Sequence, residues 1–216
     1  MTADFDAGRE PQPEPAARSR VAAIVLAGGR SRRFGSDKLA APLGGLALIE
    51  HAIGTLPADW IVIMVGPPRP LASDRKIITV REKPPGSGPA AALVTGFNAA
   101  LEHGAERIVT LPGDAPGGGL AAVRLIDALA GAGPDAAMVG VDPDGVEQPL
   151  QLALTGEPLR RLARRADVID LSARRLLADL GDYRRLPLAT GLVADVDTPD
   201  DLASLAVNAS TPSEPR

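Results

Sequence analysis

The stretch Leu26-Ala-Gly-Gly-Arg30-Ser-Arg-Arg-Phe-Gly35-Ser-Asp-Lys38 carries the strongest structural signal in this chain. It overlaps the end of residues 21–27, a continuous apolar run that is typical of a strand buried on both faces. Its two adjacent glycines let the backbone turn sharply after the strand and present N–H groups to an anion. Four positive charges fall within nine residues: Arg30, Arg32, Arg33 and Lys38. The stretch therefore predicts a cradle for a polyphosphate.

The spacing of the glycines excludes two commoner nucleotide-binding loops. A P-loop needs a glycine five residues before Gly-Lys-Ser/Thr, and a dinucleotide-binding fingerprint needs Gly-x-Gly-x-x-Gly. Neither pattern fits Gly28, Gly29 and Gly35. A solvated basic loop after an ordinary turn remains the alternative, and a double glycine with clustered cations at the end of a strand disfavours it.

The rest of the chain alternates between apolar runs and helical patterns. We expect strands at residues 21–27, 60–65, 76–80, 107–111, 135–141, 146–154 and 191–196. We expect helices at residues 46–56, 87–102 with Ser87 as the cap, 120–131, in two pieces within 157–180, and from Thr198-Pro199 onward. This alternation predicts an α/β fold, a three-layer domain with a mainly parallel sheet and a small antiparallel element at the hairpin 135–154. Ligands of such sheets bind beyond the carboxyl ends of the strands.

Composition limits the domain organisation. The chain of 216 residues is long enough for one α/β domain, which we place at residues 21–208. The polar, proline-rich segments 1–20 and 209–216 are expected to be disordered tails. Aromatic residues make up only 2% of the chain, so the core must consist of aliphatic side chains.

Charge and residue content also limit the function classes. A net charge of −4 gives no reason to expect nucleic acid or an anionic membrane as partner. The absence of cysteine excludes disulfides and thiolate chemistry. The chain has only two histidines, which disfavours a catalytic site built on histidine. The sequence shows no secretion signal and no apolar run long enough to cross a bilayer, so we expect the protein in the cytoplasm.

The glycine-rich stretch resembles the signature Leu-Ala-Gly-Gly-x-Ser-x-Arg-Met/Phe-Gly-x-Asp-Lys of the molybdenum cofactor guanylyltransferase family. That family belongs to the nucleotidyltransferases with a Rossmann-like, GT-A-type fold, and the resemblance extends from about residue 21 to residue 205. It implies that the segment Leu26, Ala27, Gly28 and Gly29 binds the nucleotide through its backbone. It also implies that Arg33 and Lys38 stabilise charge on the triphosphate and on departing pyrophosphate, as catalytic residues.

A second segment, Gly86-Ser-Gly-Pro89-Ala-Ala-Ala-Leu93, resembles the family's Gly-Gly-Pro-Leu-Ala-Gly element. The resemblance places Gly88 and Pro89 at the nucleotide, whereas the segment alone is more typical of a plain connection between strand and helix. The family usually has an aspartate near the base and ribose after the third strand. Here the equivalent is Lys83 with Glu82 beside it, and this departure leaves the choice between GTP and CTP open.

Carboxylates follow two later strands. Asp114 comes directly after the strand 107–111, where a single carboxylate suits a Mg²⁺ shared with substrate phosphates, although turn aspartates are also common after Pro-Gly. The family's Pro-x-Asp-x-Pro pattern, reproduced by residues 112–116, implies that Asp114 is a catalytic metal ligand. Asp195-Val-Asp197-Thr-Pro199 resembles a late family motif that implies Asp197 as the second ligand, with Asp195 as the alternative.

The acceptor side of the site is less distinct. Gln148-Pro149 resembles the family's His/Gln-Pro element that faces the acceptor, whereas the proline alone would mark only an edge strand or a bulge. The arginines between residues 160 and 175 are typical of a solvated helix face, but Arg174 or Arg175 could reach a phosphorylated acceptor, and we select Arg174. His51 and His103 fall within expected helices and are interpreted as surface residues.

The resemblance implies an enzyme that transfers a nucleotide from GTP to molybdopterin with Mg²⁺ and releases pyrophosphate. A phosphate nucleophile is already ionised near neutral pH, so it needs no general base. The alternatives are a cytidylyltransferase acting on molybdopterin, a transferase acting on a sugar phosphate or phospholactate, and a non-catalytic nucleotide-binding domain.

Overall fold

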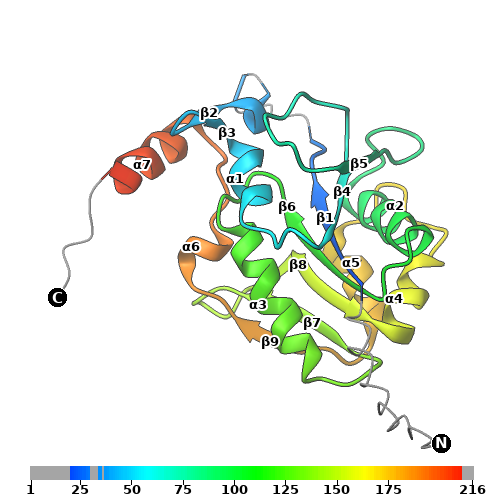
Figure 1. The fold of residues 1–216 in the computed structure, drawn as a ribbon. Helices are drawn as coiled ribbons and strands as arrows, with labels where there is room; N and C mark the ends of the chain where they lie inside the picture. Colours follow the sequence, from blue (N-terminus) through cyan, green and yellow to red (C-terminus); the bar gives the residue numbers. More distant parts are fainter. Residues whose placement is uncertain (1–19, 30–33, 36, 211–216) are drawn as a thin grey trace, which may run out of the picture.

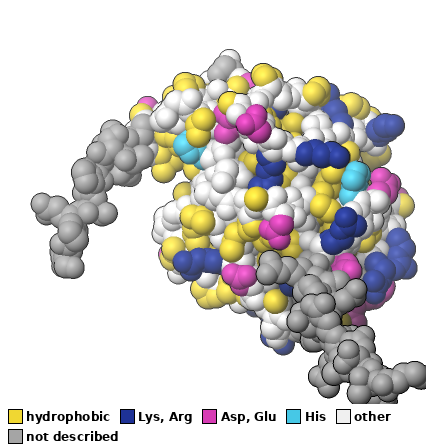
Figure 2. All heavy atoms as spheres, in the orientation of Figure 1, with side chains coloured by type: hydrophobic (Ala, Val, Ile, Leu, Met, Phe, Trp, Pro, Cys, Tyr) yellow, Lys and Arg dark blue, Asp and Glu magenta, His cyan; other side chains and the backbone are white. Residues whose placement is uncertain are grey.

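The computed structural model describes residues 20–29, 34–35 and 37–210. Arg33 and the segments 1–19 and 211–216 lie outside these residues, so the predictions on them remain predictions. Within the described part of the chain, no helix combines the length and apolarity needed to span a bilayer. Figure 2 shows acidic and basic side chains interspersed on one face of the molecule, as a small net charge would suggest.

The fold is built on a seven-stranded sheet with the order β5-β4-β1-β6-β8-β7-β9. Its strands are β1 (Val21–Leu26), β4 (Ile61–Val65), β5 (Ile77–Val80), β6 (Arg107–Pro112), β7 (Ala137–Val141), β8 (Glu147–Thr155) and β9 (Arg184–Pro187). Only β8 runs antiparallel to its neighbours β6 and β7. A separate two-stranded antiparallel sheet joins β2 (Pro42–Leu43) to β3 (Leu46–Ala47). The predicted α/β class with a mainly parallel sheet and an antiparallel element is confirmed.

Helices cover both faces of the sheet (Figure 1). One face packs against α1 (Leu48–Gly54) and α3 (Gly118–Ala130), and the other packs against α2 (Pro89–Glu102), α4 (Gly156–Ala163) and α5 (Ala173–Leu177). The short elements are η1 (Lys38–Ala40), η2 (Ala178–Leu180) and α6 (Thr190–Val193), and the chain continues into α7 (Pro199–Ser210).

The apolar run of β1 explains the two layers of the core. Ala22 and Ile24 face the cluster under α2, while Ala23 and Val25 face the cluster under α1 and α3. Successive strand residues point to opposite faces, so a strand between two helical layers must be apolar at every position. In agreement with the low aromatic content, both clusters are mainly aliphatic, and Phe97 is the largest fully buried side chain of the described residues.

Two local predictions were wrong in detail. The helix expected from residue 46 begins at Leu48, because the β2–β3 hairpin occupies the preceding residues. Ser87 does not cap α2; its hydroxyl donates to the carbonyl of Pro84, and Gly88 with φ 94° takes the capping position. The N–H of Ala90, the second residue of α2, donates instead to the carbonyl of Leu171 (3.2 Å), so it needs no side-chain cap.

The strand expected at residues 191–196 is absent from the described structure. The final strand is instead β9, which pairs in parallel with β7 and forms the edge of the sheet. Residues 190–193 form the short helix α6 beside α3. In the extended segment after it, Val196 N donates to Asp114 O (3.0 Å), and no strand ladder forms among the described residues. The apolar composition of the segment therefore reflects packing of the buried Val196 against Leu43 and Leu48 rather than strand pairing.

Candidate active site

A cleft of ≈ 720 Å³ lies at the carboxyl ends of the parallel strands. Many of the predicted nucleotide-binding and metal-binding residues line it: Leu26, Ala27, Gly28, Gly29, Lys38, Glu82, Gly88, Pro89, Asp114 and Asp197. Residues from four separate parts of the chain thus meet at one edge of the sheet, as parallel strands require.

The backbone after β1 leaves room for a ligand. Ala27 N donates to Val65 O (2.8 Å) and Gly113 N donates to Leu26 O (3.0 Å), so the end of β1 is held between β4 and β6. Gly29 has φ 124°, a conformation that side chains rarely adopt. A Cβ at Gly28 or Gly29 would meet no described atom within 4 Å, and both residues are exposed to the cleft. The loop can therefore present its backbone to phosphate oxygens.

Three carboxylates converge beside this loop. Asp114, Asp195 and Asp197 each offer one oxygen, and these oxygens lie within 4.8 Å of one another. Asp195 and Asp197 point to the same side because the extended chain alternates around the buried Val196. The sequence left open whether Asp195 or Asp197 is the second metal ligand, and the structure places both beside Asp114.

Lys38 lies directly against the carboxylates. Its Nζ is 2.6 Å from Asp114 Oδ2 and 3.1 Å from Asp197 Oδ1, and it donates to Val196 O at 2.9 Å. Burial alone would lower the pKa of Lys38, but hydrogen bonds and the charges of Asp114 and Asp197 raise it above its ordinary value. Burial, together with the charges of Asp197 and Asp114, raises the pKa of Asp195. The site therefore concentrates negative charge, which one ammonium group partly balances.

The helix that follows the carboxylates is capped by side chains. Asp201 Oδ2 accepts from Thr198 N (2.8 Å) and from Asp197 N (3.0 Å), while Thr198 Oγ1 accepts from Asp201 N (3.2 Å). This arrangement is the reciprocal capping pattern expected at Thr198-Pro199. It fixes the backbone of Asp197 at the start of α7.

Glu82, and not Lys83, faces the cleft. Glu82 is 8% exposed; its Oε1 accepts from Gly86 N (2.8 Å), while its buried Oε2 has no hydrogen-bond partner among the described residues. Lys83 is exposed and does not line the cleft. A carboxylate therefore stands near the position where the family resemblance implied an aspartate.

Arg69 is a cleft residue that sequence reasoning missed. It lies between β4 and β5, and its guanidinium donates to Ala27 O (3.0 Å) and to Asp37 Oδ2 (2.8 Å). No motif surrounds it, and the only signal was its position shortly after a buried strand, where the ligand crevice of such folds is found. Pro67, Arg81 and Leu150 line the cleft as well and were also missed.

The predicted acceptor-binding residues do not line the cleft in this structure. The Gln148 amide donates to Asp142 Oδ2 (3.2 Å) and to Val146 O (3.3 Å), within the β7–β8 turn. Pro149 comes next in β8, followed by the cleft residue Leu150. Arg174 lies in α5 and is close enough to Glu147 for its charge to act on that carboxyl. These residues flank the side of the cleft where β8 begins, and their role remains a prediction.

A known protein family matches most of this chain. The family model described as the MobA-like NTP transferase domain matches residues 23–185. The chain belongs to the MobA-like nucleotidyltransferase family. The resemblance found in the glycine-rich stretch is thereby confirmed, and the MobA-like match includes that stretch, Glu82 and Asp114, while Asp195 and Asp197 follow its end.

Individual proteins are similar to most of the chain. A probable molybdenum cofactor guanylyltransferase of Mycobacterium avium is 34% identical over 195 residues, which span 87% of this chain and 95% of the relative. A crystal structure of a Mycobacterium tuberculosis H37Rv protein has a TM-score of 0.66 and 25% identity, covering 87% of this chain and 98% of that one. A manganese complex from the same organism has a TM-score of 0.61 and 21% identity, covering 87% and 98%.

Proposed function

We propose that this chain transfers the guanylyl group of GTP to the phosphate of molybdopterin, with release of pyrophosphate, in the cytoplasmic synthesis of the molybdenum cofactor. The observation that carries the proposal is the convergence of Lys38 and three carboxylates at the mouth of the glycine-rich loop. Membership of the MobA-like family and the guanylyltransferase name of the M. avium relative support the choice of reaction.

The reaction is an in-line substitution at phosphorus. An oxygen of the acceptor phosphate bonds to the α-phosphorus of GTP, the bond to the α–β bridging oxygen breaks, and pyrophosphate leaves with that electron pair. The backbone N–H groups of Gly28 and Gly29 hold phosphate oxygens, and the ammonium of Lys38 pairs with the charge on the triphosphate. Arg33 is proposed to act in the same way and lies outside the described residues. Catalysis then depends on positioning and on charge balance.

The carboxylate cluster fits a divalent cation of the Mg²⁺ type. Asp114, Asp195 and Asp197 supply hard oxygen ligands, the kind that Mg²⁺ and Mn²⁺ take in proteins, and substrate phosphates can complete such a set. A bound cation would reduce the repulsion between the two phosphates that must approach each other. Lys38 balances Asp114 and Asp197 in this structure, and its ammonium becomes available to the triphosphate once their charge is otherwise neutralised.

Glu82 favours guanine over cytosine. A carboxylate only accepts hydrogen bonds, and the buried Oε2 of Glu82 has no partner among the described residues. Guanine presents two neighbouring N–H donors on its Watson–Crick edge, whereas cytosine presents one donor and two acceptors. The acceptor is proposed to bind where β8 begins, near Gln148, Pro149 and Arg174, since Leu150 of the same strand lines the cleft.

Two measurements test the proposal. The purified chain is incubated with Mg²⁺ and GTP, CTP or ATP, and the melting temperature is compared; GTP is expected to give the largest increase. Pyrophosphate release is then followed with GTP and molybdopterin. A larger shift with CTP would point to cytidylyl transfer, and GTP binding without pyrophosphate release would point to a non-catalytic domain. Either result would overturn the proposal.

A further inference from the structure

Arg69 connects the two ends of the glycine-rich stretch that the structure describes. One nitrogen of its guanidinium donates to Ala27 O at the end of β1 (3.0 Å), and another donates to Asp37 Oδ2 (2.8 Å) just before Lys38. The Arg69 side chain is only 9% exposed, although it belongs to a loop. A planar guanidinium can satisfy two acceptors in a fixed relative position, which a lysine ammonium does less well.

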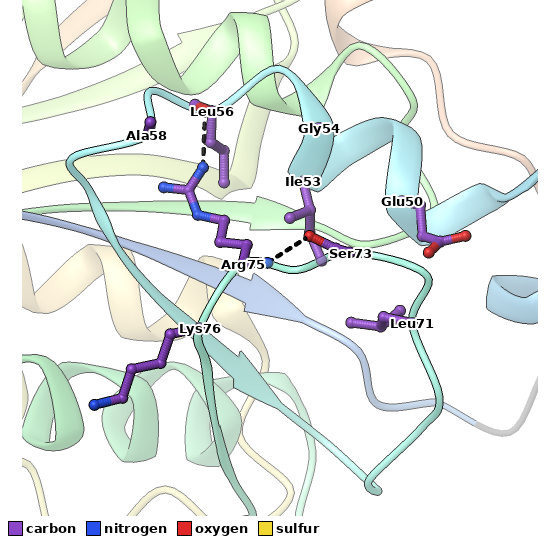
Figure 3. A pocket seen from close by; sticks show the side chains of 9 residues that line it. All are labelled: Glu50, Ile53, Gly54, Leu56, Ala58, Leu71, Ser73, Arg75 and Lys76. Carbon is purple, nitrogen blue, oxygen red and sulfur yellow. Dashed lines mark hydrogen bonds between the residues drawn. The ribbon is translucent and has the colours of Figure 1, made fainter.

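The loop that carries Arg69 is held firmly on its far side. Figure 3 shows the cavity there, between α1 and residues 71–76, with Glu50 on the helix and Arg75 turned toward Leu56. Both oxygens of Glu50 are engaged, by Ala72 N and by Ala47 N. The guanidinium of Arg75 donates to three backbone carbonyls, those of Leu56, Pro57 and Trp60. The polar groups of this cavity thus fix the loop, and Arg69 extends from a rigid support.

Asp37 connects the hydrogen bond from Arg69 to the backbone at Lys38. While Asp37 Oδ2 takes the hydrogen bond from Arg69, its Oδ1 accepts from Leu39 N (3.2 Å) and caps the short helix η1, which begins at Lys38. Ala40 N also donates to Asp37 O (3.0 Å). The position of Asp37 therefore determines the direction in which the Lys38 side chain leaves the backbone, toward Asp114 and Asp197.

We infer that Arg69 is a positioning residue, which clamps Asp37 against the end of β1 and thereby places the Lys38 ammonium at the carboxylate cluster. It acts through Asp37 and the Ala27 carbonyl rather than through a contact with the triphosphate. The consequence for turnover rests on the proposed function, but the clamp itself is a property of the protein without ligand.

The first experiment therefore uses no ligand. Amide hydrogen exchange at Leu39 and Ala40 is measured by NMR in the full chain and in Arg69→Gln, Asp37→Asn and the double variant. If the clamp holds Asp37, each single variant exchanges about tenfold faster at these amides, and the double variant exchanges no faster than the singles. Asp37→Asn keeps the shape of the side chain, so it tests the same contact if Arg69→Gln does not fold. Lys76→Gln is the matched control, because it removes an exposed charge near Arg69's loop.

The second experiment measures kcat and KM for GTP in the same variants. A misplaced Lys38 is expected to lower kcat by about 10²-fold, and Arg69→Gln and Asp37→Asn are expected to be non-additive. Arg69→Lys should restore only part of the rate, since an ammonium cannot bridge both acceptors as the guanidinium does. Lys76→Gln should match the unmodified chain.

Two outcomes would overturn the inference. One is exchange at Leu39 and Ala40 that stays unchanged in Arg69→Gln and Asp37→Asn. The other is an Arg69→Gln defect confined to the KM for GTP and additive with Asp37→Asn, which would indicate direct contact with the triphosphate. If the unmodified chain releases no pyrophosphate, the proposed function fails, yet the exchange measurement still decides whether the clamp exists.

Discussion

At the scale of single residues, the close approach of Lys38 to Asp114 shapes the chemistry of the cleft. The Lys38 ammonium lies 2.6 Å from the Asp114 carboxylate, so each group balances the charge of the other. Removing the Lys38 charge would leave Asp114 without this partner, whereas removing the Asp114 charge would leave Lys38 with Asp197 alone (3.1 Å). Substitutions of single residues in this site therefore test metal binding and charge balance.

Replacing Asp114 should separate metal binding from folding. In Asp114→Asn the cluster loses one of its three carboxylates, so Mn²⁺ affinity measured by calorimetry should fall by about tenfold or more. Pyrophosphate release should fall with it. Asp200→Asn, which changes an exposed carboxylate in the first turn of α7, should leave both unchanged. Normal Mn²⁺ affinity in Asp114→Asn would rule out this residue as a ligand.

Replacing Glu82 should change nucleotide choice. In Glu82→Gln an amide replaces the carboxylate at nearly the same shape, so the purely accepting surface offered to guanine is lost. GTP affinity should weaken by about tenfold, which corresponds to about 1.4 kcal/mol, while CTP affinity should change little. Calorimetry with both nucleotides provides the measurement, and the exposed neighbour variant Lys83→Gln provides the control. If Glu82→Gln and Lys83→Gln weakened GTP affinity equally, Glu82 would not be the residue that selects the base.

At the scale of elements, a small group of polar and charged side chains joins β9 to the start of β8. Arg185 Nε donates to Glu147 Oε1 at 2.7 Å, and Tyr183 OH donates to the same oxygen at 2.9 Å. These hydrogen bonds, reinforced by the positive charges of Arg185 and Arg174, lower the pKa of Glu147. Side chains thus link β9 to the start of β8, although its backbone pairs with β7.

The lowered pKa of Glu147 makes a prediction about acid stability. A carboxyl whose pKa is lower in the folded state stabilises the fold above its unfolded pKa, and this contribution disappears as pH falls through the folded value. The free energy of unfolding should therefore be lower in Glu147→Gln than in the unmodified chain at pH 7. The two should converge as pH falls below about 4.5, the ordinary value for this group. Urea titrations across this range would show it, and a constant difference down to the acid limit would contradict the assignment.

At the scale of the whole molecule, the two layers of helices hold the strand ends in register. The site depends on this packing, because its residues come mainly from the loops after β1, β4, β5 and β6 and from the segment before α7.

Removing the largest buried side chain should measure how much this packing contributes. Phe97 is fully buried between α2 and the sheet, so Phe97→Ala should lower the free energy of unfolding by about 3–5 kcal/mol. Leu120→Ala, at a residue 50% exposed, should cost no more than about 0.5 kcal/mol. Urea denaturation of both variants gives the comparison. A small loss in Phe97→Ala would mean that the surrounding aliphatic side chains close the cavity.

The sequence by itself determined the features that depend on neighbouring residues. The apolar run of β1, the glycine pair after it and the capped start of α7 were predictable, because burial on both faces, positive φ and helix capping each leave a local pattern. The alternation of strands and helices then placed Asp114 at the same edge of the sheet as the glycine-rich loop.

Only the tertiary structure decided which side chains meet. Asp195 joins Asp114 because Val196 is buried against Leu43 and Leu48, and β9 forms because β7 has an open edge. Glu82 rather than Lys83 faces the cleft, and Arg69 reaches Asp37 across 32 residues of sequence. None of these contacts leaves a periodic signal in the chain, since each depends on where a distant segment packs. The glycine-rich stretch thus indicated the kind of ligand, and long-range packing decided the groups that surround it.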